Sequence, residues 1–262
     1  MNTLKIVSSI FLVIFFFAYN ITLNAQMVDK LIEEGDNYTE AYNNQKALDT
    51  YLKADKLYPN NWEVLWRVSR AYVDIGEHMP EKTDDEKDAQ LVVYQKALDF
   101  AEKAVKLAPD KSITHVRRAI ANGRIALFKG VFSVAGVVNS VKEDCDKAIK
   151  LNNGDAYTIA LAHYILARTH AKTSEKWAPA RAVIGLGWAD NEIAITEYNK
   201  AINLYPNFKM FHLDLARSYI REDEFVKARE NLKKVIDSPK RDEDDDHRVA
   251  EAKKLLEEIK NE

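Results

Sequence analysis

The sequence has few of the features on which disulfide-bonded, β-rich or nucleic-acid-binding proteins depend. Its 262 residues include one cysteine, Cys145, so an intrachain disulfide is excluded. Eight glycines and six prolines are few for this length and argue against many short strands and tight turns. The formal net charge of −3 lacks the basic excess that a general nucleic-acid binder needs. A composition that is 47% apolar and 30% charged still allows a sizeable core.

Motifs for catalysis and cofactor binding are also missing. The chain has no P-loop, dinucleotide-binding glycine fingerprint, zinc-protease helix or nucleophile elbow. His163 and His170 lie two helical turns apart, too far for the usual pair of metal ligands, so we expect both to pack in the core or groove. Cys145 shares a helix face with Ala148 and is expected to be a packed thiol. The acidic run Asp242 to Asp246 lacks the alternating ligands and central glycine of a calcium loop, and we expect a solvated loop.

The first 25 residues differ from the rest of the chain. Lys5 is followed by an apolar run over residues 6–19, and Ala25 provides a small residue at a plausible cleavage site. The run is shorter than the roughly 20 residues that a spanning helix needs. We therefore expect residues 1–25 to be a cleaved signal peptide and the mature chain to be periplasmic or extracellular. The alternative is an uncleaved N-terminal anchor, the one route to membrane contact that the sequence suggests.

Residues 26–262 repeat the pattern of bulky and small residues typical of the 34-residue tetratricopeptide unit. In this unit two antiparallel helices approach closely at small residues, and a proline ends the second helix. The first unit fits without a gap, with landmarks at Leu31, Gly35, Tyr38, Ala47, Tyr51, Ala54 and Pro59. The units are expected at about 28–61, 62–111, 112–155, 156–208 and 209–242, with an amphipathic cap at about 247–260. The sequence thus predicts an all-α solenoid of about five helical hairpins with a C-terminal capping helix.

The second, third and fourth units carry extra residues between their two helices. The segment 77–92 is polar and is expected to be a mobile loop. Residues 131–138 are more apolar than a solvated loop, so we expect them to extend a helix that packs into the solenoid rather than to form an exposed partner patch. The segment from Trp177 to Trp188 contains a proline and two glycines and is expected to fold over one edge of the groove.

Several stretches of the sequence resemble the regulator of microtubule dynamics family. They lie at residues 65–71, 141–149, 163–168, 198–201 and 205–208, together with Trp177 and Arg181 in the third insert, and the resemblance covers roughly 62–240. It implies a helical-repeat binding protein with no known chemistry. The association of eukaryotic members with microtubules and organelle membranes is not carried over, because a signal peptide sends this chain to a compartment without tubulin.

In such a solenoid the first helix of each unit lines the concave face, and here that face gathers arginines and aromatic rings. The ninth position of the unit is Arg70, Arg168 and Arg217 in three units, and Arg67 and Arg117 share the sixth. The candidate partner-binding residues are Trp66, Arg67, Arg70, Arg117, Arg124, Tyr164, Arg168, Lys172, Arg217 and Arg221. Since arginine makes planar, multi-donor contacts to carboxylates, they predict a groove for an acidic or extended segment. The alternative is that these arginines pair with internal acids such as Asp36, Asp74 and Asp214.

The sequence therefore favours a non-catalytic protein-binding or scaffold module of the bacterial cell envelope, with a protein or peptide partner and neither cofactor nor metal. Two alternatives stay open. One is an envelope enzyme subunit whose site lies in the inserts. The other is a structural assembly factor that acts through apolar positions such as Phe132 and Trp188. A chain-terminus clamp of the kind in chaperone-binding relatives is not expected, because Ile32, Asp36 and Arg67 occupy three of its positions.

Overall fold

The computed structural model describes residues 26–128 and 131–262, and within these ranges the regular structure is all helical. An unlabelled helix spans residues 26–40. The helices that follow are α2 (Asn44–Leu57), α3 (Trp62–Glu77), α4 (Asp84–Leu107), α5 (Ser112–Ala126), α6 (Val131–Leu151), α7 (Ala156–Ser174), α8 (Ala178–Val183), α9 (Asn191–Leu204), α10 (Lys209–Arg221), α11 (Phe225–Asp237) and α12 (Asp245–Glu258). The predicted signal peptide, residues 1–25, lies outside the described residues.

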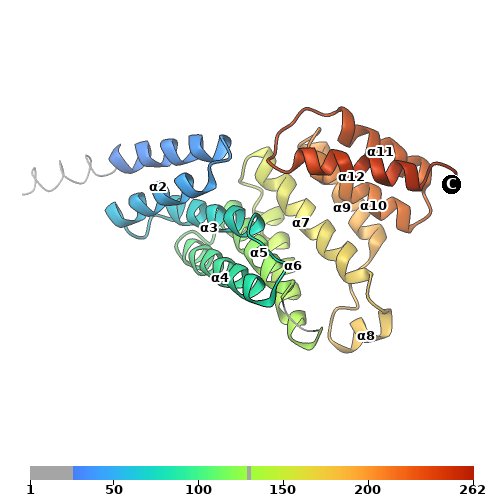
Figure 1. Ribbon diagram of the computed structural model, residues 1–262. Coiled ribbons are helices and arrows are strands. Elements are labelled where there is room, and N and C mark those ends of the chain that lie inside the picture. Colours follow the sequence, from blue (N-terminus) through green and yellow to red (C-terminus); the bar gives the residue numbers. More distant parts are fainter. Residues whose placement is uncertain (1–25, 129–130) are drawn as a thin grey trace, which may run out of the picture.

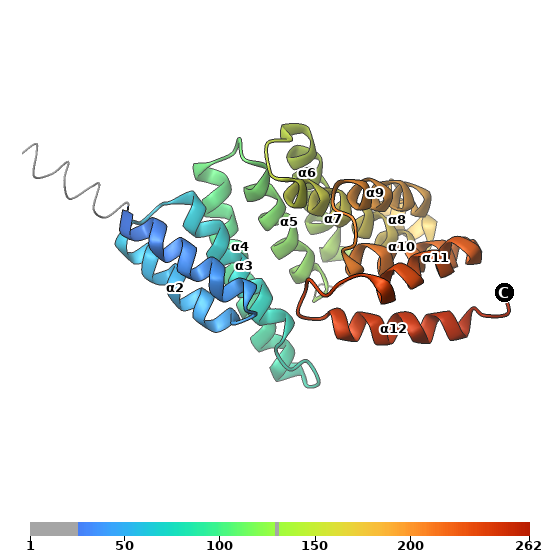
Figure 2. The same cartoon turned by 90° about the horizontal axis from the view of Figure 1, so that it is seen from above.

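Consecutive helices pack as antiparallel hairpins, as the sequence predicts for an α-solenoid. The helix of residues 26–40 pairs with α2, and the later pairs are α3 with α4, α5 with α6, α7 with α9, and α10 with α11. Helix α12 packs on α10 and α11 at the C-terminal end. Seen from above, the hairpins follow an arc that has residues 26–40 at one end and α12 at the other (Figure 2). Within the described ranges, every helix is too short or too polar to cross a bilayer.

The two helices of the first hairpin lie side by side (Figure 1), and a small residue, Gly35, sets their close approach. The ring of Tyr51 is buried against Gly35, so closely that a Cβ atom added at Gly35 would overlap it. The Tyr51 hydroxyl donates to Asp36 Oδ1 at 2.6 Å and contacts Thr39 Oγ1 at 3.2 Å. The residues whose spacing predicted the fold are therefore the residues at which the helices touch.

We expect Gly35→Ala to lower the free energy of unfolding by about 1–2 kcal/mol. Displacing the buried Tyr51 ring costs about 1–3 kcal/mol, and the better helix propensity of alanine recovers up to about 1 kcal/mol. Gly123→Ala in α5 is the matched control, because a Cβ atom there meets nothing within 4 Å and the variant should be slightly stabilised. Urea unfolding of both variants checks this, and a shift of the same sign in both would contradict it.

Most of the insert of the second unit is helical and only residues 78–83 lie between helices, so the prediction of a mobile loop over 77–92 is wrong for residues 84–92. Residues from Asp84 onward belong to α4, a helix of 24 residues. Thr83 and Glu86 form a capping box at its start: the Glu86 N–H donates to Thr83 Oγ1 at 3.2 Å, and the Thr83 N–H donates to Glu86 Oε2 at 2.9 Å. The acidic residues in the first turn of α4 stabilise the helix, because they lie at the positive end of its dipole.

The other two inserts also pack against the solenoid. Residues 131–138 form the start of α6, as expected, and Ala135 among them is buried; the side chain of Phe132 lies outside the described residues. Trp188 follows the short helix α8, packs edge-on against His170 and donates from Nε1 to Asn139 Oδ1 at 2.9 Å. The fourth unit's insert thus lies against α6 and α7.

The predicted core positions of the two histidines and the cysteine are confirmed. His163 is buried with its Nδ1 2.6 Å from Glu197 Oε2, and His170 is buried beneath Trp188. Cys145 is fully buried, and this burial raises the pKa of its thiol well above the ordinary value. Cys145 is therefore a packing residue.

Candidate functional site

The first helices of the second to fifth hairpins, α3, α5, α7 and α10, form one continuous surface on the inside of the arc, which we call the inner surface. Neighbours along this row are in contact: α3 with α5, α5 with α7, and α7 with α10. All ten candidate partner-binding residues lie on these four helices. The structure thus brings them onto one side of the molecule. The charged residues among them differ in whether they have an ion-pair partner within the chain.

Arg67 joins the first two hairpins. Its Nε donates to both carboxylate oxygens of Asp36, at 2.9 and 3.1 Å, and its Nη1 donates to the carbonyl oxygen of Glu63 at 3.0 Å. The guanidinium also lies 4.2 Å from the ring centroid of Trp66. Asp36 stands at the ninth position of the first unit and Arg67 at the sixth position of the second. This pair of positions is therefore a contact between consecutive repeats.

The same pair of positions recurs between the last two hairpins, where it forms a buried polar cluster. Asp214, at the sixth position of the fifth unit, accepts a hydrogen bond from the Tyr164 hydroxyl at 2.7 Å. Arg168, at the ninth position of the fourth unit, lies 3.7 Å from the Asp214 carboxylate, and Arg217 pairs with both Asp214 and Glu251. Burial would raise the pKa of Asp214, but Arg168 and Arg217 outweigh it and hold this pKa below its ordinary value.

Three further candidate residues also have partners within the chain. Arg124 pairs with Glu77, which ties α5 to α3. Arg221 donates to the Ala171 carbonyl at 2.9 Å and to other acceptors in the fourth unit, which ties α10 to α7. Lys172 contacts Glu175 at 2.9 Å on an exposed turn. The alternative of internal ion pairs therefore accounts for many of the predicted groove residues, and their role in binding stays a prediction.

Arg117 differs from these residues. It is 8% exposed, yet it makes no hydrogen bond or ion pair with any residue in 26–128 or 131–262, and its Nε is buried without an acceptor. Its guanidinium lies 5.3 Å from the ring centroid of Trp66. Burial, and then the like charge of Arg70, lower the pKa of Arg117 to about 10, so it remains a cation at neutral pH.

The register of the repeats explains why Arg117 has no acid to meet. Arg117 is at the sixth position of the third unit, and the ninth position of the preceding unit is Arg70. Arg70 pairs instead with Asp74 on its own helix at 3.4 Å. At the next junction the two positions are Ile120 and Ile165, which both pack against the core. The Arg70–Arg117 junction thus brings two like charges together.

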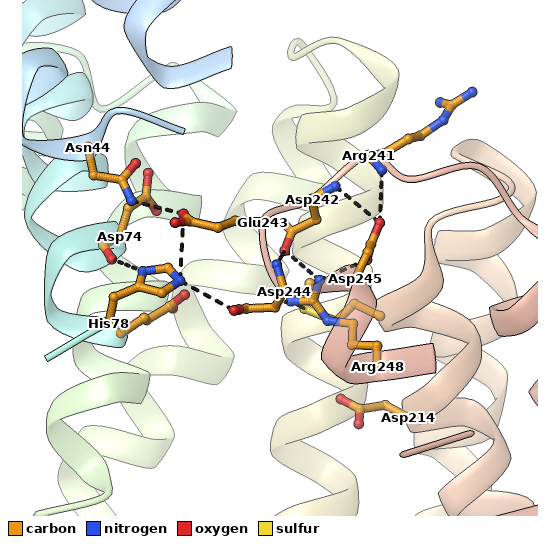
Figure 3. Close-up of polar contacts among 12 residues, drawn as sticks. Asn44, Asp74, His78, Asp214, Arg241, Asp242, Glu243, Asp244, Asp245 and Arg248 are labelled. Carbon is orange, nitrogen blue, oxygen red and sulfur yellow. Dashed lines mark hydrogen bonds and ion pairs between the residues drawn. The ribbon is translucent and has the colours of Figure 1, made fainter. Parts of the chain in front are cut away.

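An acidic connection, residues 238–244, crosses from α11 to α12 on the inside of the arc; we call it the strap. Glu243 accepts a hydrogen bond from Asn44 Nδ2 at 3.0 Å, and Asp244 lies 3.3 Å from His78 Nε2 (Figure 3). The strap therefore connects the C-terminal end of the solenoid to its first two hairpins. A hollow of about 470 Å³ lies beside this contact, lined in part by Tyr42, Ile75 and Glu243.

The prediction of a solvated loop over Asp242 to Asp246 is wrong, because Arg248 draws these acids inward. Arg248 pairs with Asp242, with Asp245 at 2.9 Å and with Asp244 at 3.5 Å. Asp245 is 1% exposed and also accepts the backbone N–H groups of Arg241 and Asp242, at 2.8 and 3.1 Å. The basic residue one turn into α12 was the sequence signal for this fold-back.

His78 makes the strap contact sensitive to protonation. Its Nδ1–H donates to the Asp74 carbonyl at 2.7 Å, so Nε2 carries a proton only in the imidazolium form. Burial would lower the pKa of His78, but the Asp74 carbonyl, Glu243 and Asp244 together raise it. Since the folded pKa lies above the unfolded value of about 6.5, this stabilisation is complete below that pH and is lost as the pH rises through the folded pKa.

Within the described ranges, no group of three or more His, Cys, Asp or Glu side chains is arranged to hold a metal ion. Apart from Arg117, the charged candidate residues on the inner surface are engaged in the ion pairs and hydrogen bonds given above. The arrangement offers cationic and aromatic contacts to a binding partner, with excess positive charge at Arg117.

Comparison with known proteins agrees with this fold. The family model described as regulator of microtubule dynamics protein 1-3 matches residues 31–260. Regulator of microtubule dynamics protein 1 of Pongo abelii is 27% identical over 237 residues, covering 87% of this chain and 72% of the relative. The Mus musculus protein of the same name is 27% identical over 234 residues, covering 87% and 74%. Regulator of microtubule dynamics protein 3 of Rattus norvegicus is 26% identical over 188 residues, covering 69% of this chain and 38% of the relative.

Solved structures of helical-repeat proteins share the architecture. A thermophilic TPR protein of Thermus thermophilus, TTC0263, superposes with a TM-score of 0.63 at 16% identity, covering 87% of this chain and 99% of its own. PilF of Pseudomonas aeruginosa gives a TM-score of 0.57 at 12% identity, covering 90% and 93%. At these identities the likeness shows the fold alone. The family match over most of the chain shows more: this chain belongs to the regulator of microtubule dynamics protein 1-3 family.

Proposed function

We propose that this chain is a non-catalytic scaffold protein that binds an acidic, extended segment of a protein partner on its inner surface. The observation that carries the proposal is the unpaired positive charge of Arg117, flanked by Trp66 and Arg70 on a surface whose other arginines are largely paired. A row of first helices allows an extended segment to contact several repeats in turn. Because the apolar N-terminal run favours export, we propose that this binding takes place in the cell envelope or outside the cell.

The ion pairs of the inner surface decide which substitutions test this proposal. Arg168 and Arg217 hold the buried Asp214, so replacing them would test folding rather than binding. Arg70 is a better target, because its one ion pair is with Asp74 on its own helix and a third of its side chain is exposed. Lys87 is the charge-matched control. It lies on α4, the second helix of its hairpin and not part of the inner surface, and it pairs with the exposed Asp84.

The test is selection from a library of displayed peptides on the purified full chain, followed by titration of the selected peptides. We expect enrichment of Asp and Glu, and binding that weakens with added salt. Arg70→Gln should weaken the selected peptides at least about tenfold, since a hydrogen bond to a charged group contributes about 1.5–3 kcal/mol. Lys87→Gln should change affinity less than about twofold. Selected peptides without acidic enrichment, or equal loss in both variants, would sink the proposal.

A further inference from the structure

The junction between the second and third hairpins holds a buried positive charge that has no direct acidic partner among the described residues. Two neighbouring arginines have acidic partners: Arg67 pairs with Asp36 across the preceding junction, and Arg70 pairs with Asp74 on its own helix. Arg117 is left over with a buried Nε that has no acceptor among the described residues. A buried guanidinium without an anion or a hydrogen-bond acceptor is costly, so such a group in a folded protein calls for an explanation.

The repeat register shows that this charge departs from the pattern of the other junctions. Where the ninth and sixth positions of consecutive units meet, the first junction pairs Asp36 with Arg67 and the last brings Arg168 to Asp214. The third junction is apolar. Only at the second of these four junctions do two arginines meet, Arg70 and Arg117. At the first and last junctions an arginine meets an acid. An acid in place of Arg70 would give the second junction the same pairing, so the group that Arg117 lacks is one carboxylate.

We infer that Arg117 and Arg70 form a subsite for one carboxylate of the bound segment, either an Asp or Glu side chain or a chain terminus. This inference rests on the proposed function, because it assigns one contact of the acidic segment. A single negative charge suits the site, because Asp74 already pairs with Arg70 at 3.4 Å and leaves one of the two positive charges, that of Arg117, without an acid. A monoanionic carboxylate therefore fits better than a phosphate dianion.

Two aromatic residues complete the surroundings of this subsite. Trp66 lies under the guanidinium of Arg117 and holds it by a cation–π contact. Tyr157 on α7 lies within electrostatic reach of both arginines, and its ring is fixed against Tyr205 and Phe208 at centroid distances of 5.0 and 5.6 Å. Burial raises the pKa of Tyr157 more than the arginines lower it, so the phenol stays protonated and able to donate.

The test compares three labelled peptides of otherwise equal sequence by fluorescence anisotropy on the full chain. One has an internal Glu and an amidated C-terminus, one has Gln and a free C-terminus, and one has Gln and an amidated C-terminus; the common sequence comes from the peptide selection. Arg117→Met should weaken binding of one of the two acid-bearing peptides at least tenfold and leave the third unchanged. The acid-bearing peptide that is weakened identifies the source of the carboxylate. Lys87→Met, which removes an exposed cation from α4, outside the inner surface, should change each affinity less than twofold.

The outcomes separate this inference from the proposed function. If the wild-type chain prefers an acid-bearing peptide and Arg117→Met keeps that preference, the subsite is wrong while acidic binding stands. If the wild-type chain binds all three peptides equally, the proposed function fails and the subsite with it. Thermal unfolding without peptide tests the unpaired charge directly. Arg117→Met should raise Tm by about 2–4 °C, and a fall of several degrees would show that Arg117 is a structural residue instead.

Discussion

Replacing Asp214 with asparagine is expected to lower the free energy of unfolding by about 2–3 kcal/mol at pH 7. The Asp214 side chain is 7% exposed, accepts hydrogen bonds from the Tyr164 hydroxyl and Arg217, and forms an ion pair with Arg168 at 3.7 Å. Breaking a fully buried pair costs about 3–5 kcal/mol. The expected loss is smaller because both arginines are more than a third exposed and keep other partners, Tyr164 and Glu251. Urea unfolding measures the difference.

The pH dependence of this loss separates charge from packing. Arg168 and Arg217 hold the pKa of Asp214 below its ordinary value, despite the burial that would raise it. Its contribution is therefore complete above the unfolded pKa of about 3.9 and is lost as the pH falls through the lower folded pKa. The stability gap between wild type and Asp214→Asn should narrow below about pH 4. Asp49→Asn, which alters an exposed carboxylate, should stay within about 0.5 kcal/mol of wild type. A gap at pH 7 no larger than that of the control would contradict the role given to Asp214.

The helical hairpins could be predicted because their contacts are local in sequence. Gly35 and Tyr51 meet within one hairpin, so the spacing of small and bulky residues reports the contact directly. The start of α4 was missed for a different reason. Residues 77–92 are polar, as a loop would be, but the Thr83–Glu86 capping box is a short motif that promotes a helix whatever the polarity around it.

The inner surface could be predicted as a set of positions but not as a set of charges. Repeat register placed Arg67 and Arg117 on the same face, and they do lie there. Arg67 is paired with an acid and Arg117 is not. The difference depends on the residue at the ninth position of the preceding repeat, which is Asp36 for Arg67 and Arg70 for Arg117. In the structure, the ninth position of one repeat meets the sixth position of the next, and this contact decides whether the arginine at the sixth position has an acidic partner. Contacts of the strap with Asn44 and His78 had no such periodic signal, because they join residues more than 160 positions apart.

Arg248→Met is the second substitution for which a large effect is expected, a loss of about 3 kcal/mol in the free energy of unfolding. Arg248 is largely buried and is surrounded by Asp242, Asp244 and Asp245, so its removal leaves three neighbouring carboxylates, one of them fully buried, without a cation. The strap should then detach from the solenoid. Hydrogen exchange should show faster exchange of the backbone N–H groups of Arg241 and Asp242, which Asp245 accepts in the wild-type chain.

The control for Arg248→Met is Lys254→Met on the same helix, α12. Lys254 is exposed and pairs with Glu258 one turn away, so the change in stability should stay below about 0.5 kcal/mol. Detachment of the strap should also remove the Glu243 and Asp244 carboxylates from His78, and the pKa of His78, followed by NMR titration, should fall relative to wild type. A lower stability with an unchanged His78 titration would mean that Arg248 supports α12 alone and that the strap is held by its other contacts. A fall in both would show that Arg248 is the residue through which the two ends of the solenoid are joined.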